Sequence, residues 1–147
     1  MRDDLSKRRL KAWIRLLGVT RMTEAALREH LRAQGTTLPR FDVLAALWRC
    51  EGPVPMGELS RMLLISNGNA TDVVGRLEAD GLVRRAPSET DRRTVLVALT
   101  EAGRGAFEGL ANGHEAEVSR LLAPLEASDL DTLRGILRKV SPGREAS

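Results

Sequence analysis

The run MGELSRMLLISNGNATDVVGRLEADGLVRR occupies residues 56–85, and DRRTVLVAL follows it at residues 91–99 after a short polar segment. Its first part has the apolar spacing of two short helices, at 56–64 and 67–80, with Ser66 as N-cap of the second. The period then becomes alternating, so that LVRR at 82–85 and TVLVAL at 94–99 predict two strands joined by a polar turn. We therefore expect two helices in tandem followed at once by a β-hairpin.

Two helices and a hairpin in this order predict a winged helix-turn-helix, whose second helix can enter the major groove of DNA. If Ala70, Val73 or Val74, and Leu77 anchor that helix to the core, its other face is polar. Asparagine can pair with an adenine edge, and the free N–H groups of a helix start suit a phosphate. The candidate DNA-facing residues are Ser66, Asn67, Asn69, Thr71, Asp72 and Arg76.

Each of these features also has a simpler explanation. Small polar residues at a helix start are ordinary capping chemistry, and polar residues at a hairpin turn prevent pairing between exposed edges. A winged helix can also serve as a protein-interaction module without specific DNA binding. A steep salt dependence of duplex binding would distinguish the two functions.

The remaining segments predict a mostly helical single domain, residues 1–147, with the hairpin as its small β element. Helices are expected at 7–33, from Thr37 to Gly52, and from Thr100 to Pro124. A last helix is expected from Ser128, as N-cap, to 140, with 141–147 outside regular structure, and EGPVP at 51–55 is expected to be a turn.

Composition excludes several other classes of protein. A single cysteine, Cys50, cannot form an internal disulfide, and His30 and His114 are too far apart in sequence for metal-ligand spacing. We therefore expect no metal and no cofactor. The longest apolar run, MLLI at 62–65, cannot span a bilayer, which predicts a cytoplasmic protein without membrane contact. GRGAFEG at 103–109 has the wrong spacing for a nucleotide-binding loop and lies in a helical stretch, so no enzyme is expected.

The net charge of +3 is modest, but 20 of the 23 basic residues are arginine, which suits phosphate and base-edge contacts. Residues 1–40 carry ten basic against four acidic residues, and residues 82–100 carry four against two. Basic charge therefore collects near the first helix and on the hairpin.

A family resemblance is carried by three runs: LPRFDVLAAL, the 56–85 run and DRRTVLVALTEAG. Together they resemble the multiple antibiotic resistance regulator (MarR) family over roughly residues 10–140. The resemblance implies that 67–80 is the recognition helix and 87–94 the wing. It implies that Asp91 orients the wing by pairing with arginine and that Arg93 reaches the minor groove. Arg92 is then the phosphate contact, with Arg84 and Arg85 pointing to opposite sides of their strand. Asp72 and Gly75 depart from the family pattern, which leaves the base read by the helix open.

Both chain ends are amphipathic, and the resemblance implies that they dimerise. We expect a winged-helix DNA-binding lobe at 37–100 and a helical dimerisation layer from 7–33 and 101–140. A two-fold dimer implies a pseudo-palindromic operator in double-stranded DNA. The resemblance also implies a small aromatic or phenolic effector, with Trp13, Arg15 and His30 as conceivable contacts. It further implies a transcriptional regulator that is more often a repressor than an activator. Glycines 105, 109 and 113 recur on one helix face and predict close packing there.

Overall fold

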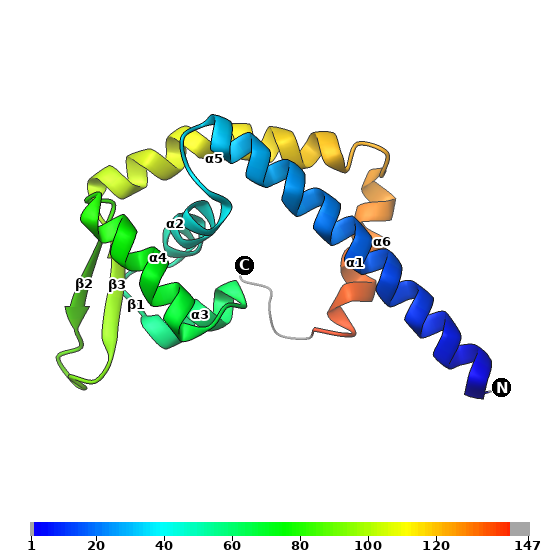
Figure 1. The fold of residues 1–147 in the computed structure, drawn as a ribbon, viewed down its shortest axis with the longest axis horizontal. Helices are drawn as coiled ribbons and strands as arrows, with labels where there is room; N and C mark the ends of the chain where they lie inside the picture. The colour runs from blue at the N-terminus through cyan, green and yellow to red at the C-terminus, as the bar shows by residue number, and fades with distance from the viewer. Residues whose placement is uncertain (1, 142–147) are drawn as a thin grey trace.

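The computed structural model of the protein describes residues 2–141 and consists of helices with one small sheet (Figure 1). Of the expected end segment 141–147, residues 142–147 lie outside the described residues. The elements in chain order are α1 (Arg2–Ala33), α2 (Leu38–Arg49), β1 (Val54–Pro55), α3 (Met56–Leu63), α4 (Asn67–Ala79), β2 (Val83–Pro87), β3 (Val95–Leu99), α5 (Glu101–Leu121) and α6 (Ala127–Arg138). The predicted winged helix-turn-helix is confirmed, with α3 and α4 as the helix pair and β2–β3 as the hairpin.

The sheet has three antiparallel strands in the order β1–β3–β2, and β1 is the element that the sequence did not reveal. Val54 pairs with Val97, so the expected turn at 51–55 is wrong at its end. Two residues are too few to show a strand period, and only tertiary pairing identifies them as a strand. Pro87 closes β2, an edge strand, where a residue without an N–H is tolerated.

The core lies where α2, α3 and α4 pack on this sheet. The fully buried large side chains are Leu31, Leu44, Leu59, Leu77, Val43, Val74, Val83 and Val97. Because they come from α1, α2, α3, α4 and two strands, the helix pair and the hairpin share one core. Helix α4 is therefore held at a fixed angle to the β2–β3 hairpin.

The predicted N-caps of α2, α4 and α5 are confirmed, whereas the starts of α6 and α1 differ from the prediction. Thr37 accepts from the Arg40 N–H, and Thr100 accepts from the Gly103 N–H at 3.0 Å, as expected for N-caps. The Ser128 N-cap is wrong: Asp129 accepts from the backbone N–H of Glu126 at 3.0 Å, which starts α6 two residues earlier. Helix α1 begins at Arg2 rather than residue 7, since neither glycine nor proline interrupts the chain before Gly18.

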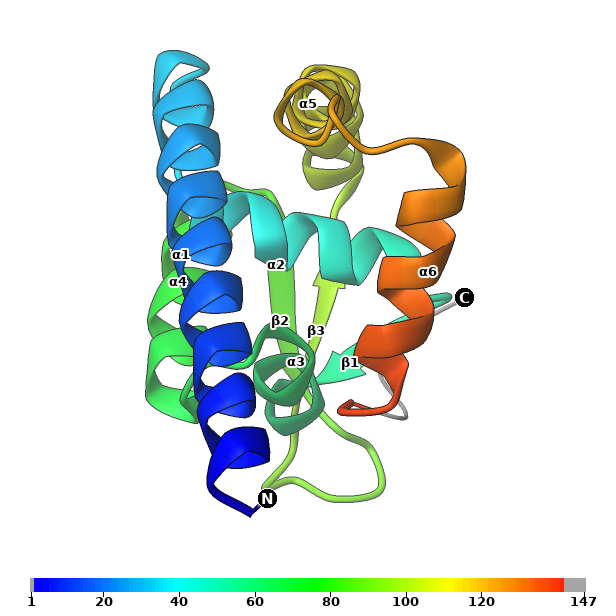
Figure 2. The same ribbon diagram turned by 90° about the vertical axis from the view of Figure 1, so that its right-hand side faces the viewer.

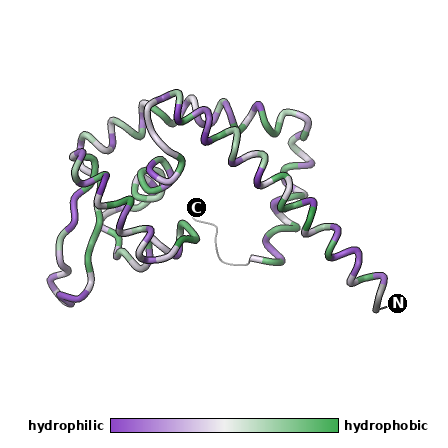
Figure 3. Tube along the Cα trace, viewed as in Figure 1, coloured by the Kyte–Doolittle hydropathy of each residue, from purple (hydrophilic) through white to green (hydrophobic). Residues whose placement is uncertain are grey.

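Helices α1, α5 and α6 form an arch outside the lobe. Figure 2 shows α1 and α6 on opposite sides of α5, and Figure 3 shows apolar positions all along α1, including the part that extends away from the lobe. No residue of α6 is buried. Exposed apolar side chains on the two helices include Leu10, Trp13, Ile14, Leu16, Met22, Leu133, Ile136 and Leu137. In the single chain, the amphipathic faces of α1 and α6 therefore remain largely uncovered.

Close packing at a glycine occurs at Gly103 rather than along the predicted face of α5. A Cβ at residue 103 would overlap the carbonyl oxygen of Leu82, whereas Gly105 and Gly109 have open space around them. Only Gly113 of the predicted three has a neighbour, His30 Nε2, at 3.3 Å from an added Cβ. The expectation for 105 and 109 is therefore wrong within the single chain.

Gly103→Ala is expected to lower the free energy of unfolding by about 3 kcal/mol, because the start of α5 must separate from the start of β2. Gly105→Ala is the matched control, and it should be neutral or stabilise by up to about 1 kcal/mol through helix propensity. Urea unfolding at one fixed protein concentration measures both. Equal unfolding midpoints for the two variants would contradict the contact.

Within residues 2–141, no helix is long and apolar enough to cross a membrane.

Candidate nucleic-acid interface

Helix α4 presents its polar face outward, as its sequence period predicts. Ala70, Val74 and Leu77 are fully buried, whereas the predicted contacts Ser66, Asn67, Asn69, Thr71 and Arg76 are all exposed. The hydroxyl of Ser66 accepts from the Asn69 N–H at 3.1 Å and so caps the helix. The side-chain amides of both asparagines remain available at the helix start.

Two of the outward residues already have partners on α4. Thr71 donates its hydroxyl to the Asn67 carbonyl oxygen at 2.8 Å, and Arg76 lies 3.3 Å from the Asp72 carboxylate. The Arg76–Asp72 pair is exposed, so it stabilises the helix only slightly and can exchange for a phosphate. The negative charge of Asp72, a residue that departs from the family pattern, is thus balanced by Arg76.

The hairpin turn at 88–94 is organised by Asp91. Its carboxylate accepts from the Arg93 backbone N–H at 3.0 Å and from the Thr94 hydroxyl at 3.3 Å. The Thr94 N–H donates to the Asp91 carbonyl oxygen, and the Ser88 N–H to the Thr94 carbonyl oxygen. Asp91 thus pairs with the backbone of Arg93, and within residues 2–141 its carboxylate forms no ion pair with an arginine side chain.

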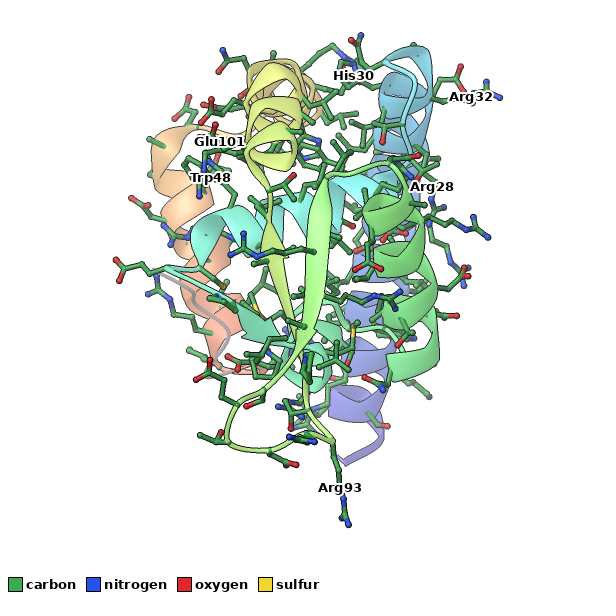
Figure 4. All side chains as sticks on the ribbon, turned by 90° about the vertical axis from the view of Figure 1, so that its left-hand side faces the viewer. Arg28, His30, Arg32, Trp48, Arg93 and Glu101 are labelled. Carbon is green, nitrogen blue, oxygen red and sulfur yellow. The ribbon has the colours of Figure 1, made fainter. Side chains whose placement is uncertain are left out.

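This turn leaves both wing arginines exposed, and Figure 4 shows Arg93 pointing away from the body at the end of the hairpin. Strand β2 ends at Pro87 and β3 begins at Val95. Residues 91 and 93 therefore both lie in the turn and not on a strand. Their guanidinium groups are placed by the turn geometry and not by a pleat.

A groove of about 540 Å³ separates the start of α4 from the hairpin and α3. We call it the wing groove; its border includes Arg61, Asn67, Thr71, Arg85 and Arg93. The structure thus brings the helix start and the wing to one surface. Arg61 and Arg85 also border the wing groove. The sequence analysis did not identify Arg61 as a candidate contact.

Arg84 and Arg85 do point to opposite sides of β2, and they have different surroundings. Arg85 donates to Glu78 of α4 from its backbone N–H at 2.9 Å and from its guanidinium at 2.9 and 3.2 Å. These bonds lower the pKa of Glu78. Arg84 borders a different depression, with Pro53 and Leu96, so it is not part of the wing groove.

Further contacts fix the end of α4 to the rest of the lobe. Arg40 of α2 pairs with Asp80 at 2.6 Å, and the Thr100 hydroxyl donates to the Gly81 carbonyl oxygen at 2.6 Å. Together with Arg85 and Glu78, they tie α4 to α2, to β2 and to the start of α5. These contacts join the end of α4 to the elements around it.

A second cavity, of about 780 Å³, lies between α2, α3 and α5, and we call it the aromatic cavity. Its walls include the rings of Phe41, Trp48 and Phe107. Trp13 and Arg15, which were conceivable effector contacts, do not border it; both lie exposed on α1. His30 lies beside Gly113 and near His114, which does border it.

Comparison with known proteins places this geometry in a family. A family model described as the MarR family matches residues 34–94, which run from just before α2 through the wing. The multiple antibiotic resistance protein MarR of Escherichia coli K12 is 32% identical over 126 residues, covering 84% of this chain and 86% of MarR. The chain belongs to the MarR family.

Solved structures of the MarR family have the same fold. AbsC, a MarR family transcriptional regulator from Streptomyces coelicolor, matches with a TM-score of 0.82 and 30% identity, covering 90% of this chain and 91% of AbsC. A MarR mutant from Escherichia coli complexed with operator DNA matches with a TM-score of 0.75 and 31% identity, covering 86% and 91%. BpsR of Bordetella bronchiseptica, whose DNA binding is regulated by 6-hydroxynicotinic acid, matches with a TM-score of 0.80 and 25% identity, covering 89% and 98%.

Family membership assigns a general function to this MarR-family chain. Its relatives are named transcriptional regulators, and one is seen bound to its operator. The chain is therefore a DNA-binding transcriptional regulator and not an enzyme, and the alternative of a pure protein-interaction module is set aside.

Proposed function

We propose that the protein is a homodimeric repressor that binds a pseudo-palindromic operator and is released by a small aromatic or phenolic ligand. The wing groove carries the proposal, because it gathers Asn67, Thr71 and Arg93 from two separate elements on one exposed surface. As a regulator of chromosomal genes it would act in the cytoplasm. A dimer bound across promoter DNA would block transcription, which is the proposed mode of repression.

The proposed assembly follows from the uncovered faces of α1 and α6. A helix of 12 residues such as α6, with no buried residue, is marginal on its own in water. A second copy would cover its apolar side together with that of α1, where Trp13 is 55% exposed. Residues 7–33 and 101–140 would then form the dimerisation layer, and residues 37–100 the DNA-binding lobe.

The proposed DNA contacts divide by groove. The start of α4 would enter the major groove, where Asn67 and Asn69 meet base edges. Arg93 would reach into the minor groove, whose negative potential favours arginine, and Arg92 would contact phosphate. Asp91 would hold the turn in place. Ser66, Thr71, Arg76 and, from the neighbouring strand face, Arg84 would add polar and phosphate contacts.

The proposed ligand response rests on the aromatic cavity and on a relative. The regulation of BpsR by 6-hydroxynicotinic acid shows that a protein of this fold can respond to a small aromatic molecule. The cavity lies between α5 and the helices of the lobe, so an occupant would alter how the two are packed. Since α4 is tied to α5 through Thr100 and Gly81, such a change would reach the recognition helix.

Replacing Asn67 or Asn69 by alanine is expected to relax base preference at one position in each half-site, by about 1–3 kcal/mol. Neither side chain is buried, so folding should be unaffected. Competition binding with single-base operator variants measures the preference. Gln34→Ala, an exposed amide at the far end of α1, is the control. An equal loss of affinity on all sequences would assign these residues to backbone contacts instead.

A further inference from the structure

We propose that the aromatic cavity selects a planar aromatic ligand that carries a positive charge, rather than an aromatic carboxylate. This inference rests on the proposed ligand response and specifies the chemical class of the ligand. Three features of the cavity carry it: its flat aromatic walls, the sign of the charges on its border, and a carboxylate without a partner.

The walls form a connected series of rings. The Trp48 and Phe107 ring centroids lie 5.1 Å apart, those of Phe107 and Phe41 5.7 Å, and His114 stacks on Phe41 at 4.1 Å. Trp48 remains 43% exposed although it stands at this wall, and Figure 4 shows it at the end of α2 on the same side as Glu101 of α5. A planar ligand can therefore continue the series, and the ring faces attract cations.

The charged border of the cavity is predominantly acidic. Asp42, Glu108 and Glu115 contribute carboxylates, and Arg49 is the basic residue on the described border. His114 adds no fixed positive charge near neutral pH, because burial and the nearby His30 lower its pKa. An aromatic acid placed among these groups would face like charges, which disfavours it, whereas a cation would face opposite ones.

Asp42 gives the cavity a specific acceptor. It is partly buried on α2, and within residues 2–141 its carboxylate has neither a hydrogen bond nor an ion pair. Its oxygen atoms are not fully buried, so water can reach them, and a ligand donor could take the place of that water. Burial and Glu24 raise its pKa to about 6, while Arg49 and Arg28 act in the opposite direction. A ligand amine or amidinium that bonds to Asp42 would satisfy this acceptor and stabilise its ionised form.

The size of the cavity agrees with this ligand class. About 780 Å³ lies within the range of ordinary small-molecule sites, roughly 300–1,000 Å³. One or two fused rings with a cationic substituent would fit beside Trp48.

Titration calorimetry of the full chain with benzamidine and with benzoate tests the proposal, because the two probes share a planar ring and differ in charge. We expect benzamidine to bind at least about tenfold more tightly than benzoate. Asp42→Asn should weaken benzamidine binding about tenfold and leave benzoate binding unchanged or stronger. Arg49→Gln should strengthen benzamidine binding, and Glu101→Gln, outside the border, should change neither.

The pH dependence provides a second readout. The groups that face Asp42 are Glu24 and Arg28 from α1, Arg49 from α2, and Glu108, His114 and Glu115 from α5. Benzamidine affinity should increase as pH rises through about 6, since Asp42 then ionises. Loss of a proton from His114, whose pKa is also lowered, acts in the same direction, and Asp42→Asn separates the two because it removes only the first.

Tighter binding of benzoate would overturn the proposal and would show that basic side chains from outside the described border set the charge. Equal binding of the two probes, binding insensitive to Asp42→Asn, or no binding of either probe would also overturn it. Operator release by benzamidine is measured separately. Cation-selective binding without release would refute the proposed ligand response and leave the assigned ligand class standing.

Discussion

Arg93→Ala is expected to weaken operator binding by at least about 30-fold. Each dimer loses two groove contacts, each worth about 1–3 kcal/mol, and the slope of affinity against salt falls by about one unit per half-site. The effect should be large because α4 contributes little net charge: its Arg76 is paired with Asp72. The wing arginines are exposed at the end of the hairpin, so their removal costs little folding free energy.

Two companion variants separate charge from turn geometry. Arg32→Ala removes an exposed arginine that Figure 4 shows at the opposite end of the molecule from Arg93, and it should leave both affinity and salt slope unchanged. Asp91→Ala keeps the wing arginines but removes the acceptor of the Arg93 N–H and the Thr94 hydroxyl. It should weaken binding without lowering the salt slope. Fluorescence anisotropy across a salt series measures all three, and wild-type affinity for Arg93→Ala would remove the wing from the mechanism.

Deletion of residues 124–147 is expected to give a monomer whose operator affinity falls by about 10³-fold or more, toward that of non-specific binding. The reason is geometric: a single chain can occupy only one half-site. Because no residue of α6 is buried, the winged-helix core should still fold. Sedimentation velocity measures the assembly, and circular dichroism checks the fold.

A charge placed on α6 provides a test with the full chain. Leu133→Arg combined with Leu137→Arg alters the apolar face, on which each side chain is 39% exposed, and should also yield monomers. Gly135→Arg adds one positive charge on the opposite side of α6, where an added Cβ meets nothing, and should remain a dimer. A truncated chain or double variant that still sediments as a dimer would refute the proposed layer.

Local sequence signals predicted the winged-helix lobe because its elements are defined over short distances. The 3.6-residue period identified Ala70, Val74 and Leu77 as the buried face of α4, and this left the asparagines outward. The hairpin followed from the change of period at residue 82. Ser66, Thr37 and Thr100 cap their helices as their side-chain chemistry predicts.

The features that were missed depend on contacts between distant segments. Strand β1 exists only through its pairing with Val97, and Gly103 is required only because Leu82 lies against it. The Glu78–Arg85 pair and the position of Arg61 likewise depend on how α3, α4 and β2 pack together. The aromatic cavity combines Phe41 and Trp48, seven residues apart on α2, with Phe107 of α5, and no sequence spacing joins the two helices.

The central proposal, that a dimer reads two half-sites through the wing groove, is tested most directly by changing the operator. A duplex selected by the full chain from fragments of the source genome would be compared with the same duplex carrying about five extra base pairs, half a helical turn, between its half-sites. The proposal predicts one dimer on the selected duplex and a loss of nearly all specific affinity after the insertion, because the half-sites then face opposite sides of the helix. Unchanged affinity for the lengthened duplex, or a selected sequence without two-fold symmetry, would contradict it.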